Sequence, residues 1–221
     1  QDVAAGQEPS IENPSIYEKG TDWQDEILQM ALMQNYQVAA SGGSKDTRYY
    51  LSLSMFDQEG VIKRSGIRRY QTRLNLDRKI GDKINIGANF QFSHSSRKPN
   101  LVSLGGFDYQ SSALATPPTM PIYNEDGSFY EGFPLDQLNV PNPLRDQGLD
   151  KNTSEVLRST NSLWASYKII EGLTIKETIS YDFIDNQSTT YWPMNSNNGE
   201  AYNGLMIKYP YQHHNIYSST V

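Results

Sequence analysis

Aromatic side chains set among amides are the residues of this sequence best suited to binding chemistry. The chain contains 15 Tyr, 7 Phe and 3 Trp, and many of them lie in its middle and near its C-terminus. Aromatic faces beside a few orienting polar groups are typical of pockets that hold sugars or peptides. The candidates for ligand binding are Tyr109, Tyr123, Tyr130, Tyr191 and Trp192. The alternative is that these rings pack the loops against one another.

Catalytic and metal-binding arrangements are not recognisable in the sequence. Glu125 and Asp126 are adjacent carboxylates, but the stretch 124–127 has the composition of a turn rather than of an acid–base pair. His213 and His214 are neighbours whose side chains seldom converge on one ion, and no third ligand has suitable spacing. The chain has no cysteine, which excludes disulfides, Cys-ligated zinc and thiol catalysis. We therefore expect neither an enzyme nor a bound metal or cofactor.

The charge and hydropathy of the chain also bear on which classes of partner it can bind. The net charge is −6 at pH 7, and Lys and Arg form no cluster, which does not favour nucleic acid. No apolar run approaches the roughly 18 residues of a membrane-spanning helix, although a membrane-spanning β-strand needs only about 10 alternating residues. The first residues carry no secretory signal, so either one was removed or the chain is a piece of a longer protein.

The elements that must position these residues are predicted by period-two alternation of apolar and polar side chains. In the stretch 68–80 one set of alternate positions is mainly apolar, and it includes Tyr70, Leu74 and Leu76. The other set holds Arg69, Arg73 and Asp77. Such alternation indicates strands with one apolar face. We predict strands over 36–41, 48–56, 67–80, 83–95, 159–169 and 173–183, and long loops over 96–155 and 185–221.

The lengths of the connections indicate which environment the apolar face meets. In an antiparallel arrangement the short connections 42–46, 80–82 and 170–172 fall at one end, and the long loops fall at the other. This asymmetry is typical of outer-membrane barrels. Arg68 and Arg78 flank the apolar run, and ten tilted residues rise about 25 Å, the height of a lipid-facing band. We therefore expect an all-β protein whose polar face, with Arg69, Arg73 and Asp77, lines a lumen. A half-buried strand of a soluble sheet is the alternative.

Glu177 does not fit the alternation, because it falls in the middle of the apolar set of 173–183. A carboxylate on a lipid-facing surface is costly. Either the register shifts at a bulge near Glu177, or protein covers this strand.

Several short strings occur along the chain in a specific order and spacing: Thr21–Glu26, Ser41–Ser44, Tyr49–Gly60, Asn75–Asp77, Gly87–Asn89, Pro117–Pro121, Tyr123–Gly127 and Asn142–Pro143. In this order they resemble the SusC/RagA group of TonB-dependent outer-membrane transporters. The resemblance extends to about residue 184.

The resemblance implies a barrel of about 22 strands closed by an N-terminal plug. It also implies import of oligosaccharides or peptides across the outer membrane of a Gram-negative bacterium. The expected partners are a SusD-like surface lipoprotein, outer-membrane lipid and the TonB complex, which supplies energy. Against that pattern residues 1–221 hold no plug, so we expect a partial barrel domain, with TonB engaged through the missing N-terminal part. The competing interpretation is a soluble carbohydrate-binding β-sandwich module of a larger secreted protein.

Overall fold

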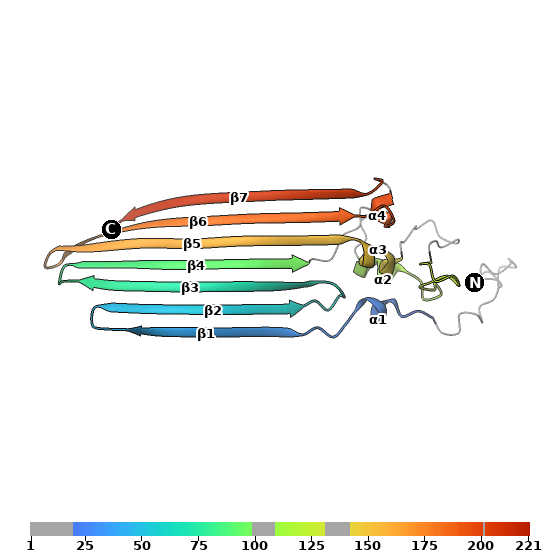
Figure 1. Ribbon diagram of the computed structural model, residues 1–221, viewed down its shortest axis with the longest axis horizontal. Coiled ribbons are helices and arrows are strands. Elements are labelled where there is room, and N and C mark those ends of the chain that lie inside the picture. Colours follow the sequence, from blue (N-terminus) through green and yellow to red (C-terminus); the bar gives the residue numbers. More distant parts are fainter. Residues whose placement is uncertain (1–19, 99–108, 131–141, 201) are drawn as a thin grey trace, which may run out of the picture.

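A computed structural model describes residues 20–98, 109–130, 142–200 and 202–221. Within these residues, seven strands form a single antiparallel sheet in chain order (Figure 1). The strands are β1 (Met33–Gly43), β2 (Thr47–Glu59), β3 (Gly66–Ile80), β4 (Ile84–Lys98), β5 (Lys151–Ile170), β6 (Leu173–Trp192) and β7 (Leu205–Thr220). The fold is therefore an antiparallel meander, as the alternation predicts.

The connections divide between the two ends of the sheet. Figure 1 shows the short turns β1–β2, β3–β4 and β5–β6 at one end. Four short helices lie at or beyond the other end: α1 (Trp23–Ile27), α2 (Tyr109–Ala115), α3 (Pro143–Leu149) and α4 (Asn197–Glu200). Gly81 and Gly172 adopt φ values of +62° and +82° at two of the tight turns, a conformation that side chains with a Cβ disfavour. The predicted segregation of short and long connections is confirmed.

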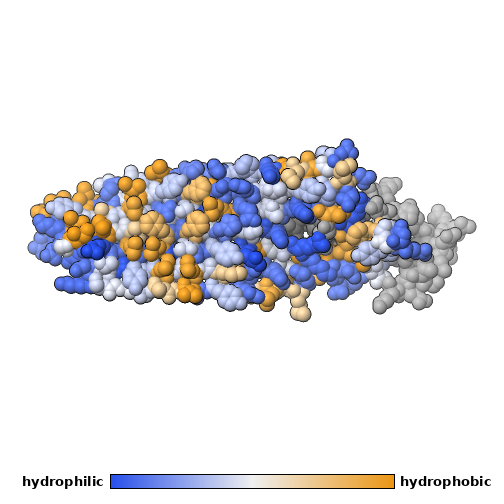
Figure 2. Space-filling view, viewed as in Figure 1, coloured by the Kyte–Doolittle hydropathy of each residue, from blue (hydrophilic) through white to orange (hydrophobic). Residues whose placement is uncertain are grey.

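The strand pairing places the alternating side chains on two distinct faces. We call one side the apolar face; in it Val38 pairs with Leu53, which pairs with Thr72 and then Phe92. We call the opposite side the polar face; in it Asn75 lies between Tyr50 and Asn89. Figure 2 shows hydrophobic residues gathered mostly over the part of the strands nearer the short turns. Each strand thus separates its side chains by chemistry.

The apolar face is open. Its exposed side chains include Val38 (74%), Leu53 (52%), Phe92 (46%), Leu163 (55%), Ile179 (53%) and Ile216 (76%). Burial of one such side chain stabilises a protein by about 1.5–3 kcal/mol, so a surface of this extent marks contact with a membrane or with protein. No helix packs broadly over the sheet in the part of the chain that the structure describes, because the helices contact one another instead. The buried cluster of Trp23, Ile27, Ala113 and Met120 lies among α1, α2 and the loop that follows α2.

Three predicted bounds are wrong. Strand β5 begins at Lys151, inside the loop predicted over 96–155, and β6 continues to Trp192. Strand β7 occupies 205–220, where a loop was expected. In these stretches both faces carry polar or mixed side chains, so the hydrophobic alternation disappears although the backbone still pairs with its neighbours. Pro210 and the Asn-rich and Ser-rich composition favour a loop locally, but pairing with β6 decides the conformation.

Glu177 keeps its place on the apolar face without a bulge beside it. The register shift in this hairpin lies between Lys168 and Ile170, next to the turn. Glu177 pairs with Ala165 and with Thr220, whose hydroxyl donates a hydrogen bond to the carboxylate. The same cross-strand row contains Arg78, which was predicted to mark the edge of the apolar band. The bulge explanation is wrong, because the register shift lies away from Glu177 and a neighbouring hydroxyl contacts its carboxylate. Cover of this strand by protein stays a prediction.

Candidate lumen wall and loop cluster

The polar face brings Arg69, Arg73 and Asp77 onto one side of β3. The Arg73 guanidinium donates a hydrogen bond of 3.2 Å to the Gln91 side-chain oxygen on β4. The Arg69 guanidinium lies 5.5 Å from the centre of the Phe56 ring, which places a cation against an aromatic face. These contacts form a ladder of polar groups across neighbouring strands.

Asp77 lies beside a feature that the sequence analysis missed. Its partner on β4 is Gly87, and Gly87 pairs with Trp164 on β5. A Cβ at Gly87 would overlap the Trp164 ring, so the indole lies directly over this glycine. The Lys176 amine lies 4.8 Å from the centre of the same ring. A lone glycine inside a strand is the signal that could have predicted this close approach.

A charged pocket of about 380 Å³ opens at the short-turn end of the sheet beside Trp164. Asp77, Arg48 and Asn85 line it from the polar face, together with the turn residues Lys45 and Asp46. Among the lining residues, Lys79 pairs at 3.3 Å with Asp82 of the adjoining turn, and no ion pair within 4 Å joins two residues of the lining itself. The pocket therefore offers charges to whatever occupies the space enclosed by the polar face.

The five aromatic candidates do not meet in one site. Tyr123 packs against Phe129 with ring centres 5.1 Å apart and ring planes tilted by 32°, and Tyr130 packs against the buried cluster near α1. Tyr191 and Trp192 are consecutive in β6 and therefore point to opposite faces. Trp192 is 8% exposed, and its ring centre lies 6.3 Å from the ring centre of Tyr202. Tyr109 begins α2, and its side chain lies outside the described residues. These contacts support the packing alternative for Tyr123, Tyr130 and Trp192.

The buried cluster of Trp23, Ile27, Ala113 and Met120, which we call the loop cluster, is held by hydrogen bonds between two of the strings that resemble the transporter group. The Trp23 indole N–H donates to the Pro117 carbonyl at 3.1 Å, and the Thr21 hydroxyl donates to the Met120 carbonyl at 2.9 Å. The Asp22 carboxylate accepts hydrogen bonds from the backbone N–H groups of Gln24 and Asp25, which caps the N-terminus of α1. Segments about a hundred residues apart in sequence are thus joined at the long-loop end of the sheet.

The stretch 124–127 forms the predicted turn. The Gly127 N–H donates to the Asn124 carbonyl at 3.0 Å, and Gly127 has a φ of +82°. The side-chain hydroxyl and the backbone N–H of Ser128 both donate to one Asp126 oxygen, at 2.6 and 2.9 Å. These hydrogen bonds, the hydroxyl first, lower the pKa of Asp126. The carboxylate therefore stabilises a turn.

The two histidines of β7 lie on opposite faces of the sheet. His213 stacks on Tyr211 with ring centres 6.4 Å apart, whereas the His214 ring nitrogen Nδ1 lies 2.9 Å from the Tyr181 hydroxyl. Among the described residues, no three His, Asp or Glu side chains gather into a possible metal site. The prediction of a loop at these residues was wrong.

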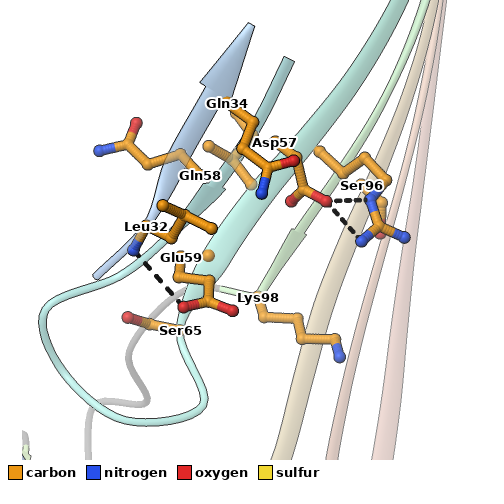
Figure 3. Close-up of a pocket in the computed structure, with 11 residues that line it drawn as sticks. Leu32, Gln34, Asp57, Gln58, Glu59, Ser65, Ser96 and Lys98 are labelled. Carbon is orange, nitrogen blue, oxygen red and sulfur yellow. Dashed lines mark hydrogen bonds and ion pairs between the residues drawn. The ribbon is translucent and has the colours of Figure 1, made fainter. Parts of the chain in front are cut away.

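Polar residues border the apolar face at the long-loop end. Arg68 and Asp57 form an ion pair of 2.5 Å, and the Ser96 hydroxyl donates to Glu155 at 2.6 Å. His94 lies 3.1 Å from the same Glu155 carboxylate. Figure 3 shows the pocket beside this row, which has a volume of about 270 Å³. Since Gln34 and Gln187 continue the row on β1 and β6, the apolar face ends in a hydrogen-bonded polar border.

A meander with one open apolar face, one polar face and short turns at a single end defines the wall of a transmembrane β-barrel. None of the helices within the described residues has the length and apolar character to cross a bilayer. The solved RagAB peptide importer in its open-open state superposes with a TM-score of 0.67 at 21% identity, over 88% of this chain and 22% of that one. The RagAB peptide transporter superposes with a TM-score of 0.63 at 21% identity, over 81% of this chain and 21% of that chain.

Curated relatives agree with this class. TonB-dependent receptor P26 of Formosa agariphila is 37% identical over 194 residues, which is 86% of this chain and 18% of that protein. TonB-dependent receptor SusC of Bacteroides thetaiotaomicron is 29% identical over 224 residues, 89% of this chain and 22% of that protein. No protein-family model matches the sequence. The chain spans about a fifth of the length of these relatives, and it corresponds to a barrel segment of a TonB-dependent receptor of the SusC/RagA type.

Proposed function

We propose that this chain is part of the barrel wall of an energised importer in the outer membrane of a Gram-negative bacterium. The observation that carries the proposal is the open apolar face backed by a polar face whose residues are hydrogen-bonded across strands. A lipid-facing band and a wet lumen require this combination, whereas a soluble sheet does not. The short turns then face the periplasm and the long loops face the exterior.

The proposed cargo is an oligosaccharide or a peptide. The solved neighbours are described as a peptide importer, which supports the peptide class, whereas the oligosaccharide class rests on the resemblance of the short sequence strings to the transporter group. The lumen side would offer Arg69, Arg73 and Asp77 to the cargo or to a plug. Tyr109, Tyr123, Tyr130, Tyr191 and Trp192 remain the candidates for contact with ligand.

The proposed partners follow from the same assignment. A SusD-like lipoprotein would cover the end of the barrel where the loop cluster lies, and the TonB complex would act through residues outside this chain. The loop cluster supports the first partner, because its internal packing around Trp23 and Met120 holds Tyr123 at 53% exposure and the Asn124–Gly127 turn at the surface. A docked protein needs such a firm platform.

The test begins with the location of the full-length protein. We expect it to fractionate with outer membrane and to show heat-modifiable gel mobility, whereas a freely soluble protein would contradict the barrel and support the β-sandwich alternative. Uptake is then measured in cells with labelled oligosaccharides and peptides, with and without the neighbouring lipoprotein and TonB. Alanine at both Tyr191 and Trp192 is compared with wild type. Unchanged uptake and affinity would remove these two residues from the candidate ligand site.

A further inference from the structure

A groove of about 460 Å³ crosses the apolar face near the short turns. Its walls and floor on this face come from two cross-strand rows of β2 to β5: Thr47, Arg78 and Ile86 in one, and Leu76, Ala88 and Leu163 in the other. Asp77, Gly87 and Trp164, which belong to the polar face, complete the lining. Ala88 lies between two leucines, so its short side chain leaves the hollow. The volume falls within the range of about 300–1,000 Å³ that small ligands occupy.

The groove has a cationic end. Arg78 is exposed and makes no ion pair or hydrogen bond through its side chain with the residues that the structure describes. Thr47 pairs with Arg78 and places a hydroxyl beside the guanidinium on the same face. A guanidinium fork with a neighbouring hydroxyl is well suited to a phosphate group.

Arg68 and Arg78, which border the apolar run of β3, differ in whether a carboxylate pairs with them. Arg68 already has a carboxylate, because Asp57 lies 2.5 Å away. Arg78 lies ten residues further along β3, at the opposite border, and no carboxylate neutralises it among the described residues. An arginine at the border of an apolar band keeps its stem on the apolar surface and its guanidinium toward the polar side, where it can meet an anion. Of these two arginines, Arg78 is the one that leaves its guanidinium open to an anion.

We propose that this groove binds one phospholipid of the periplasmic leaflet, with an acyl chain over Ala88 and the phosphate on Arg78 and Thr47. The proposal rests on the proposed membrane location. The groove is continuous with the lipid-facing surface, which supplies the apolar half of the ligand, and the unpaired guanidinium supplies the polar half. A second barrel docked at the same place would need its own carboxylate opposite Arg78.

The experiment uses the full-length transporter purified from outer membranes, stripped of lipid in detergent and titrated with phosphatidylglycerol or phosphatidylethanolamine. Native mass spectrometry counts the lipid that stays bound. Arg78→Gln should weaken retention about tenfold, the loss expected for one charge-assisted contact. Ala88→Leu should fill the groove and weaken retention of both lipids. The matched controls are Arg68→Gln, whose arginine is already paired, and Ala40→Leu, on the apolar face of β1 outside the groove.

Each outcome decides the proposal. Loss of both lipids in Arg78→Gln supports the site with the shared phosphate as ligand, and loss of phosphatidylglycerol alone supports it with net negative charge as ligand. Equal retention in wild type, Arg78→Gln and Ala88→Leu would overturn it, as would a change in oligomeric mass with lipid retention intact. Heat-modifiable mobility verifies that each variant folds. Uptake is measured on the same variants, so loss of the lipid site and failure of the transport proposal are distinguishable.

Discussion

The orientation of the two faces can be tested by two adjacent arginine substitutions on β1. Val38 lies on the apolar face and is 74% exposed, whereas Gln37 is its neighbour on the polar face. Val38 is joined through Leu53 to Thr72, which lies between the bordering residues Arg68 and Arg78. Val38→Arg therefore puts a guanidinium near the middle of the lipid-facing band, while Gln37→Arg puts the same group toward water.

The expected magnitudes differ widely. Arginine near the bilayer midplane of a barrel destabilises it by about 2–4 kcal/mol. That is a factor of roughly 30 to 1,000 in the folding equilibrium. Substitution at an exposed polar position changes stability by about 0.5 kcal/mol or less. Val38→Arg should thus lower the free energy of unfolding by several times more than Gln37→Arg does.

The assay is urea unfolding of the full-length protein in phospholipid vesicles, followed by tryptophan fluorescence and by heat-modifiable gel mobility. Gln37→Arg controls for the added charge and for the bulk of arginine on the same strand. Equal destabilisation by both substitutions would refute the assignment of the faces, and a larger loss in Gln37→Arg would reverse it.

Three further predictions follow from single contacts. Gly87→Val should destabilise the barrel by about 1–3 kcal/mol, because a Cβ at this glycine overlaps the Trp164 ring. Adding Trp164→Ala to the same chain should restore part of the lost stability. Strictly additive effects of the two substitutions in urea unfolding would contradict the contact. Trp23 is 3% exposed, so Trp23→Ala should lower the stability of the loop cluster by about 3–5 kcal/mol. Limited proteolysis should then cut near 109–130 while the strands stay protected. An unchanged cleavage pattern would argue against the cluster. Ser128→Ala should raise the Asp126 pKa toward its ordinary value in an NMR titration, since the lowered pKa comes from the Ser128 hydrogen bonds. The ionised Asp126 stabilises the turn at pH values above the pKa of the unfolded chain, and this stabilisation is lost as the pH falls through the lower folded pKa. An Asp126 pKa that stays the same in Ser128→Ala would contradict this cause.

The parts of the strands that lie within the apolar band were predictable because their two faces differ in chemistry. Residues 68–80 alternate so regularly that both the strand and the opposite orientation of Arg73 and Leu74 follow from local geometry. The ends of β5 and β6 and all of β7 were not predictable in this way. Beyond the apolar band both faces are polar, so alternation carries no signal, and Pro210 favours a loop until β6 provides a partner.

The candidate site was predicted less completely than the fold. Placement of Arg69, Arg73 and Asp77 on one face follows from period two alone. The five aromatic candidates were chosen by composition, which does not report what a ring contacts. Tyr130 turned out to pack on the loop cluster, and the Trp192 ring lies beside Tyr202.

The sequence by itself determined the alternation, the two faces and the short turns, because each depends on neighbours within a few residues. Only the tertiary structure decided which residues share a cross-strand row. Asp57 neutralises Arg68 but no described carboxylate neutralises Arg78, and Thr220 satisfies Glu177. Trp164 lies over Gly87 from a strand about eighty residues away. Register between distant strands results from backbone pairing along the whole sheet, so no local pattern contains it.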